Sequence, residues 1–217
     1  MKLKPKKILI LLGLLLLLVT TICHAPIFTQ DLAGIHVWRQ SQTQLNIINF
    51  YRYDFNILNP RHHALNINAG NTILRYEFPL MQWMIALNHK LFGPHIAVTR
   101  ISLFLLSIIT LLGVFQLLLT LFKHTWSAFG NLGICLSDLY SSYYSINPLP
   151  DNFALLHTIW FLFFFFRYIQ SKSVLDLVCS ALFISLAALS KLPFVLAGVV
   201  AAFYVLTNSW TANRKQL

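Results

Sequence analysis

Long apolar runs are the feature that most limits how this chain can fold. The hydrocarbon core of a bilayer is about 30 Å thick, so a helix that crosses it needs about 20 mainly apolar residues. Runs of roughly that length cover residues 8–28, 101–122, 126–146, 149–166, 174–190 and 193–210. The sequence therefore predicts an all-α transmembrane bundle with about six spans.

The composition agrees with a membrane protein and argues against nucleic acid as a partner. Hydrophobic residues make up 57% of the 217 residues and charged residues only 10%, whereas about a quarter of a soluble domain is usually charged. The formal net charge is +10, but the Lys and Arg residues stand singly or in small groups at the ends of apolar runs. That placement is typical of topology signals and of contacts with anionic lipid.

Basic residues around the apolar runs predict how the chain is oriented in the membrane. Lys2, Lys4, Lys6 and Lys7 precede the first run, so the positive-inside rule places the N-terminus in the cytoplasm. Six crossings then place three further basic groups in the cytoplasm: Lys123 with His124, Arg167 with Lys172, and Arg214 with Lys215. The first run could also be a cleaved signal peptide ending near Cys23, but its length and the spans that follow favour an uncleaved anchor.

The predicted organisation has four parts. Residues 1–28 form the anchor span, 29–100 an extracytoplasmic loop, 101–210 a five-span bundle and 211–217 a cytoplasmic tail. Within the loop, 35–53 has helical spacing. Residues 79–92 form an apolar stretch with one polar side that is too short to cross, which favours a helix lying in the membrane interface with Trp83 at headgroup depth.

The placement of three carboxylates indicates where chemistry could occur. Asp31 follows the first span, Glu77 precedes the interfacial segment and Asp151 opens the fourth span, so all three are predicted on the outer face. A carboxylate near hydrocarbon is costly unless it is paired, protonated or functional. Such residues could deprotonate an acceptor hydroxyl while cations hold a phosphate leaving group. We therefore expect Asp31, Glu77, Asp151 and Lys191 to gather in a single pocket on the outer face. The alternative for Asp31 and Asp151 is a structural role at the start of a helix.

The same face carries the predicted ligands for substrate and metal. Predicted substrate ligands there are His36, Trp38, Arg39, Gln40, Arg61, Arg100 and Lys191. Imidazole and carboxylate are suitable zinc ligands, so Glu77 with His62 could hold a divalent metal ion, although their spacing matches no compact ligand motif.

Several short segments resemble one family of membrane enzymes. They are, in order, residues 36–43 (HVWRQSQT), 59–60 (NP), 77–80 (EFPL), 91–93 (LFG) followed by Arg100, 150–151 (PD) and 190–191 (SK). In this order they resemble the bacterial members of the dolichyl-phosphate-mannose protein mannosyltransferase family, which are multispanning glycosyltransferases of the GT-C superfamily. The resemblance implies sugar transfer from a polyprenyl-phosphate lipid to a protein, lipid or glycan acceptor outside the cytoplasm, with inversion, in a bacterial inner membrane.

The resemblance also implies roles for individual residues. Glu77 matches an acidic residue that lies near the donor or a metal in family members. Asp151 matches an aspartate beside their active site, and Lys191 matches a lysine that holds the lipid phosphate. Asp31 is the candidate base by its location, because Gln42 stands where many similar segments have Asp. Family members are usually longer, so the chain is expected to be a truncated form or the N-terminal half of a split enzyme, with a second chain supplying further spans.

Two rival functions remain open from the sequence. A small transporter or channel could use Asp138, Arg100 and Lys191 to line a pathway across the bilayer. A non-catalytic subunit of a membrane assembly is the other alternative. The long polar loop at 29–100 is more than a simple carrier needs, which favours the transferase.

Overall fold

The computed structural model describes residues 5–61, 76–124, 130 and 143–214 of the chain. These residues form helices and the segments that join them, without a β-strand among them. In chain order the helices are α1 (Pro5–His24), η1 (Ala25–Ile27), α2 (Val37–Arg52), α3 (Leu80–Phe92), α4 (Ile96–Phe122), α7 (Pro150–Ser171), α8 (Val174–Ser190), η2 (Leu192–Ala197) and α9 (Gly198–Arg214). The predicted all-α class is confirmed.

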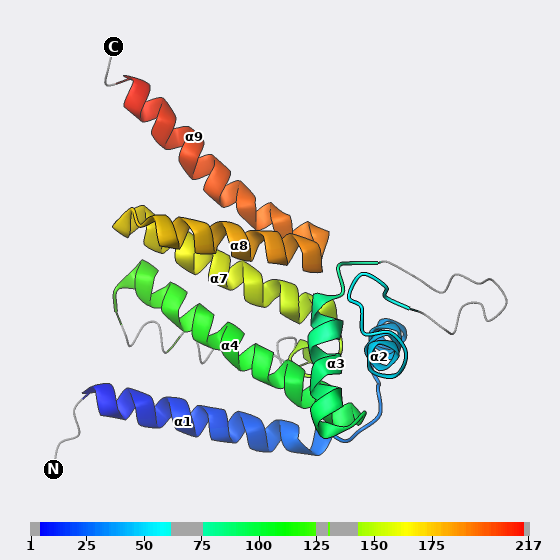
Figure 1. Cartoon of the computed structure of the whole chain (residues 1–217). Helices are drawn as coiled ribbons and strands as arrows, with labels where there is room; N and C mark the ends of the chain where they lie inside the picture. The colour runs from blue at the N-terminus through cyan, green and yellow to red at the C-terminus, as the bar shows by residue number, and fades with distance from the viewer. Residues whose placement is uncertain (1–4, 62–75, 125–129, 131–142, 215–217) are drawn as a thin grey trace.

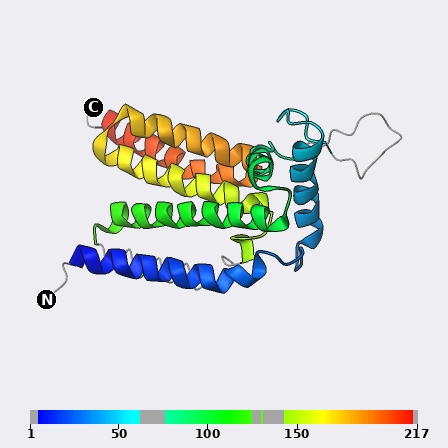
Figure 2. The ribbon, with the colours of Figure 1, turned by 60° about the horizontal axis from the view of Figure 1, so that its bottom comes forward.

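The long helices lie side by side, and the two short helices of the first loop cover one end of them. Figure 1 shows α1, α4, α7 and α8 with their axes roughly parallel, and α2 and α3 at the end opposite to both chain termini. The rotated view in Figure 2 shows the same arrangement. We call the end that carries α2 and α3 the α2–α3 end, and the opposite one the termini end.

The bundle presents apolar side chains outward, as a membrane protein does. Among the described residues, α4 and α7 are each long and apolar enough to cross a bilayer, and shorter apolar helices lie at 11–27, 174–190 and 192–207. Helix α4 exposes a stripe spaced by three to four residues, formed by Ile101, Leu105, Ile109 and Leu112. Such a stripe on one face of a helix faces an apolar solvent or partner. The predicted third span, 126–146, lies mostly outside the described residues.

The helix boundaries follow the local sequence. Lys123 and Lys172 end α4 and α7 in the left-handed conformation, a common way for a helix to end. Helix α3 ends at Gly93, whose φ of +90° suits glycine, and Pro94 follows it. The predicted run at 193–210 is divided into η2 and α9, and η2 carries Pro193 in its first turn, where the missing N–H of proline is tolerated.

The buried core lies where α2 and α3 meet the long helices. Buried residues from four helices form it: Ile47 and Phe50 from α2, Met81, Ile85 and Ala86 from α3, Leu103 from α4 and Phe153 from α7. In α2 and α3 these residues recur every three to four positions, which places them on one side of each helix. The core therefore fixes the first-loop helices against the bundle.

Candidate active site

Two of the carboxylate–cation pairs at the α2–α3 end consist entirely of predicted site residues. The first joins Arg39, in the first turn of α2, to Glu77, just before α3. Gln82 donates a hydrogen bond to the other oxygen of Glu77 at 2.8 Å. The side chains of Arg39 and Glu77 are 25% and 14% exposed, so the pair is partly shielded from water and interacts more strongly than a surface pair.

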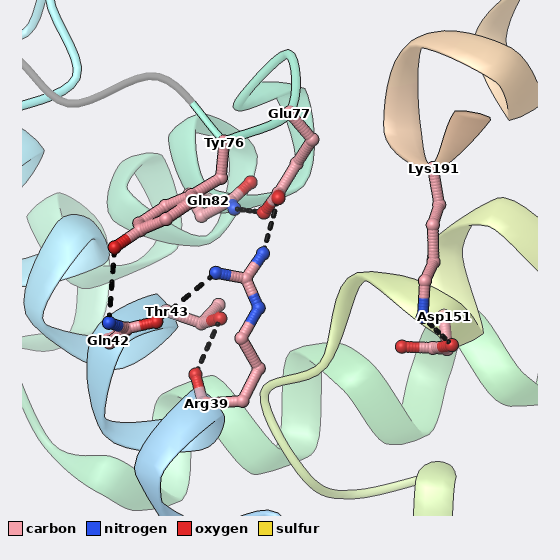
Figure 3. A network of polar contacts seen from close by, with 8 residues as sticks. All are labelled: Arg39, Gln42, Thr43, Tyr76, Glu77, Gln82, Asp151 and Lys191. Atoms are coloured by element: carbon pink, nitrogen blue, oxygen red, sulfur yellow. Dashed lines mark hydrogen bonds and ion pairs between the residues drawn. The ribbon is translucent and has the colours of Figure 1, made fainter.

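Tyr76 and Gln42 complete the surroundings of this pair. The guanidinium of Arg39 lies 4.9 Å from the centre of the Tyr76 ring, a cation–π distance. Gln42 accepts a hydrogen bond from Arg39 at 3.4 Å and donates one to the Tyr76 hydroxyl at 3.2 Å. These contacts hold the guanidinium on the Glu77 side of α2, as Figure 3 shows. A shallow pocket is lined by residues of this network.

The second pair joins Asp151, in the first turn of α7, to Lys191, directly after α8. Figure 3 shows the lysine side chain reaching from the end of α8 to the carboxylate. The backbone N–H of Phe78 donates to the carbonyl of Leu189 at 3.1 Å. This bond fixes the segment that carries Glu77 beside the end of α8, so the structure brings both pairs to one region.

Asp31 lies in a different pocket from Glu77. It is exposed and lines a cavity with Arg100 and Tyr143, and its carbonyl oxygen accepts a hydrogen bond from Arg100 at 2.8 Å. The sequence predicted that Asp31, Glu77, Asp151 and Lys191 gather in a single pocket. The structure places all four at the α2–α3 end, but Asp31 and Glu77 line separate pockets there.

The other predicted substrate ligands are spread over the same end. His36 and Trp38 are exposed at the start of α2, and Gln40 is buried with its amide donating to Ala33 at 3.0 Å and to the Tyr143 hydroxyl at 2.6 Å. Both bonds of the Gln40 amide therefore serve to hold the segment before α2 in place. Arg61 pairs with Asp54 at 3.3 Å in the segment after α2.

Asp54 stabilises the turn that follows α2. Its carboxylate accepts hydrogen bonds from the backbone N–H of Asn56 at 3.0 Å and the amide of Asn59 at 3.2 Å. These bonds and nearby Arg61 hold the pKa of Asp54 below its ordinary value. Asp54 thus has a local structural role, and its pair with Arg61 offers a control for the two pairs described above.

The described residues do not by themselves supply a metal site. No group of three His, Cys, Asp or Glu side chains close enough to bind a metal occurs among them, and both oxygens of Glu77 are engaged by Arg39 and Gln82. His62, the predicted partner of Glu77, lies outside the described residues, as does Asp138. The metal requirement stays a prediction.

Sequence reasoning missed the amide and hydroxyl groups that support the pairs. Gln82, Tyr76 and Tyr143 were not predicted as site residues, yet each is bonded to one that was. Gln82 stands five residues after Glu77 and is buried in α3 with the core residues, and its spacing from Glu77 is the available signal. Tyr143 is 103 residues from Gln40, and no local pattern links the two.

Comparison with known families identifies one family for this chain. The sequence profile described as dolichyl-phosphate-mannose-protein mannosyltransferase matches residues 77–217. The chain belongs to this family. The match begins at Glu77 and includes Asp151 and Lys191, so the mannosyltransferase-family region contains the whole second pair and the acidic member of the first. No curated protein and no solved structure matches the chain significantly. The family resemblance predicted from the sequence is confirmed, and with it a membrane glycosyltransferase in general terms.

Proposed function

We propose that this chain transfers a sugar from a polyprenyl-phosphate donor to an acceptor outside the cytoplasm, at the α2–α3 end of the bundle. One observation carries the proposal. The Arg39–Glu77 and Lys191–Asp151 pairs lie at the same end of the helix bundle, in a chain that belongs to a mannosyltransferase family. The bond from Phe78 to Leu189 joins the backbone segments that carry them.

In the proposed step, an acceptor hydroxyl attacks the anomeric carbon of the donor sugar. The bond from that carbon to the phosphate oxygen breaks, the lipid phosphate leaves with the bonding electrons, and a carboxylate takes the hydroxyl proton. Attack from the face opposite to the leaving group inverts the anomeric carbon.

The paired arrangement supports both halves of the step. Glu77 and Asp151 each bring a carboxylate oxygen, the kind of atom that can accept the hydroxyl proton, to the α2–α3 end. Their partners Arg39 and Lys191 carry N–H groups toward the region where the phosphate would leave, and preorganised donors of this kind stabilise developing negative charge. Asp31 remains a third candidate base, from the neighbouring cavity.

The test is sugar transfer in proteoliposomes that contain the full chain and a polyprenyl-phosphate mannose with a labelled sugar. Loss of a general base typically lowers the rate by about 10²–10⁴-fold, so we expect such a loss for one of Glu77→Gln, Asp151→Asn or Asp31→Asn. The matched control is Asp54→Asn, which removes a carboxylate from an ion pair in the turn after α2 and should leave the rate nearly unchanged. Wild-type rates in the triple variant of Asp31, Glu77 and Asp151 would remove the proposal.

A further inference from the structure

A cavity separate from that of Asp31 opens beside Glu77. It is formed by residues of two segments, 57–60 after α2 and 76–79 before α3. Its volume is about 280 Å³, close to the lower end of the range of about 300–1,000 Å³ typical of ligand pockets. The proposed reaction needs a place for the acceptor beside a carboxylate, and this cavity borders one of the three candidate bases.

The walls of this cavity are largely flat rings without charge. Pro60, Tyr76, Phe78 and Pro79 contribute rings to it. Glu77 is the charged residue among the described residues that line it, and Arg39 balances that charge. The face of an aromatic ring carries partial negative charge and attracts C–H groups with partial positive charge, as those of a sugar ring have. The walls therefore favour a neutral ligand with a flat C–H face.

The pocket of Arg39 and Glu77 adjoins this cavity and contains two oxygens that lack a donor. Four residues line both spaces: Pro60, Tyr76, Glu77 and Pro79. Oε1 of Gln82 and Oδ1 of Asn46 are buried there without a hydrogen-bond partner among the described residues. Gln82 is only 4% exposed, and its amide nitrogen already donates to Glu77 at 2.8 Å (Figure 3). Leaving a buried acceptor unpaired is costly.

The space beside these two oxygens suits a hydroxyl group. Its volume is about 10 Å³, enough for one group the size of a water molecule. A hydroxyl that enters it can donate to an amide oxygen while the rest of its molecule occupies the larger cavity. The two spaces together fit a molecule that combines a flat C–H face with hydroxyl groups at its edge.

We propose that the acceptor is a carbohydrate whose ring binds in the cavity of 57–60 and 76–79, with hydroxyl groups donating to Gln82 and Asn46. The inference rests on the proposed function and names the class of its acceptor. In the transfer, one hydroxyl oxygen bonds to the anomeric carbon of the donor sugar, its hydrogen passes to a carboxylate, and the lipid phosphate leaves with the electrons of the broken bond. A serine or threonine side chain has a single hydroxyl, which loses its hydrogen in that step. A sugar ring carries further hydroxyls on neighbouring carbons, and these remain to donate to the two amide oxygens.

Protection of a cysteine from labelling tests binding without the donor. Leu58→Cys is made in the full chain with Cys23, Cys135 and Cys179 replaced by Ser, because Leu58 is 62% exposed and lines the cavity. In a detergent without a sugar headgroup, the probes are the methyl glycosides of glucose, galactose, mannose and N-acetylglucosamine. At ten times its half-saturating concentration, at least one glycoside should slow maleimide labelling by about tenfold, as mass action requires, whereas sorbitol should not.

The matched control for labelling is Tyr53→Cys in the same background. Tyr53 is 64% exposed and does not line the cavity, so its rate of labelling should not change when the glycoside is added. Absence of protection at residue 58 by all four glycosides would overturn the inference.

Transfer assays connect this cavity to the reaction. Proteoliposomes that contain labelled polyprenyl-phosphate mannose receive either the protective glycoside or a peptide rich in serine and threonine. A larger kcat/KM for the glycoside than for the peptide supports the inference. A larger value for the peptide would overturn the inference and leave the proposed function intact. Protection without transfer to either acceptor would overturn the proposed function, and the acceptor role of the cavity with it.

Asn46→Leu tests the unpaired oxygens directly. It removes one acceptor and should raise the KM for the glycoside by about two- to tenfold, the usual weight of one neutral hydrogen bond, with little change in kcat. The matched control is Gln44→Leu on the same helix, whose side-chain oxygen is also buried without a partner among the described residues but does not line this pocket. Equal KM values in the two variants would overturn the placement of the acceptor hydroxyls, and the labelling result decides the matter if Asn46→Leu does not fold.

Discussion

Three of the four cations predicted to bind substrate are held by carboxylates in the structure. The pair of Arg39 and Glu77 is the most shielded of these, and Gln82 and Tyr76 fix its geometry. Removing one partner of a shielded pair leaves an uncompensated charge, whereas removing both restores neutrality. Stability measurements can therefore separate the structural role of this pair from its proposed chemistry.

We predict that Arg39→Ala lowers the free energy of unfolding by about 1–3 kcal/mol, because Glu77 then stays partly buried without its cation. Adding Glu77→Gln to Arg39→Ala should recover part of the loss. Chemical unfolding in detergent measures the free energy of unfolding of the single and the double variant. Arg61→Ala, which breaks a more exposed pair, should cost no more than about 1 kcal/mol. Strictly additive effects of Arg39→Ala and Glu77→Gln would show that the two charges are not coupled.

The buried ring of His89 should make the free energy of unfolding depend on pH. Its ring is fully buried in α3, with Nε2 2.9 Å from the Thr99 hydroxyl and Nδ1 without a partner. Burial, with a smaller contribution from His95, lowers the pKa of His89 to about 4. The neutral ring is thus favoured in the folded state, while the unfolded chain takes up the proton near the ordinary pKa of about 6.5.

The direction of the pH effect on stability follows from the linkage between proton binding and folding. Because the folded state has the lower pKa, the contribution to stability is complete above about pH 6.5 and is lost as the pH falls toward 4. The shift corresponds to about 3 kcal/mol in total. The fall in unfolding free energy between pH 6.5 and 4 should be smaller by that amount in His89→Gln, which does not titrate. Equal pH dependence in the two proteins would contradict the buried neutral ring.

At the scale of elements, α3 shows why a pattern can reveal a helix without revealing its surroundings. An apolar stretch with one polar side, too short to cross a bilayer, predicted a helix at 79–92 in the membrane interface, and α3 is Leu80–Phe92. Its buried side packs on α2, α4 and α7 in the core. Trp83 packs against Phe55, ring to ring at 5.0 Å, and donates to the Phe55 carbonyl at 3.0 Å. Protein contacts therefore hold Trp83 in place.

We predict that Ile85→Ala, in the core contact of α3, lowers the free energy of unfolding by about 2–5 kcal/mol, the usual cost of the cavity it would leave. The matched control is Leu87→Ala on the same helix, whose side chain is 41% exposed and whose truncation should cost clearly less. Thermal unfolding in detergent compares them. Similar losses for both variants would show that α3 does not dock through the face assigned to it.

At the scale of the whole molecule, the short connections that follow α4 and α7 carry basic residues at the termini end. The start of α1 and the ends of α4 and α7 lie at the termini end (Figure 1), and Lys123 and Lys172 follow α4 and α7 there. The Arg39–Glu77 and Lys191–Asp151 pairs belong to the α2–α3 end, and a further pair, Arg167 with Asp176, joins α7 to α8 at the termini end. Basic residues in short loops are typical of the cytoplasmic side, so the orientation with the N-terminus in the cytoplasm stays a prediction. The proposed chemistry requires that orientation, because the proposed acceptor is outside.

Cysteine labelling in cells tests the orientation. In a background with Cys23, Cys135 and Cys179 replaced by Ser, a membrane-impermeant maleimide should label Leu58→Cys in intact spheroplasts, because residue 58 is exposed at the α2–α3 end. It should label His124→Cys, at the end of α4, only after the membrane is permeabilised. Labelling of both residues from the same side would contradict the arrangement.

The sequence by itself determined the class of the protein, the helices and the candidate residues. Apolar runs, short-range periodicity and basic flanks are local properties, and they were sufficient to predict the helices that the structure has at α2, α3, α4 and α7. Only the tertiary structure decided how residues far apart in the chain are grouped. Glu77 meets Arg39 while Asp31 lies with Arg100, because the docking of α2 and α3 and the bond from Phe78 to Leu189 fix those distances. The residues in these contacts are 38 to 111 positions apart in the sequence, so no local pattern predicts that they meet.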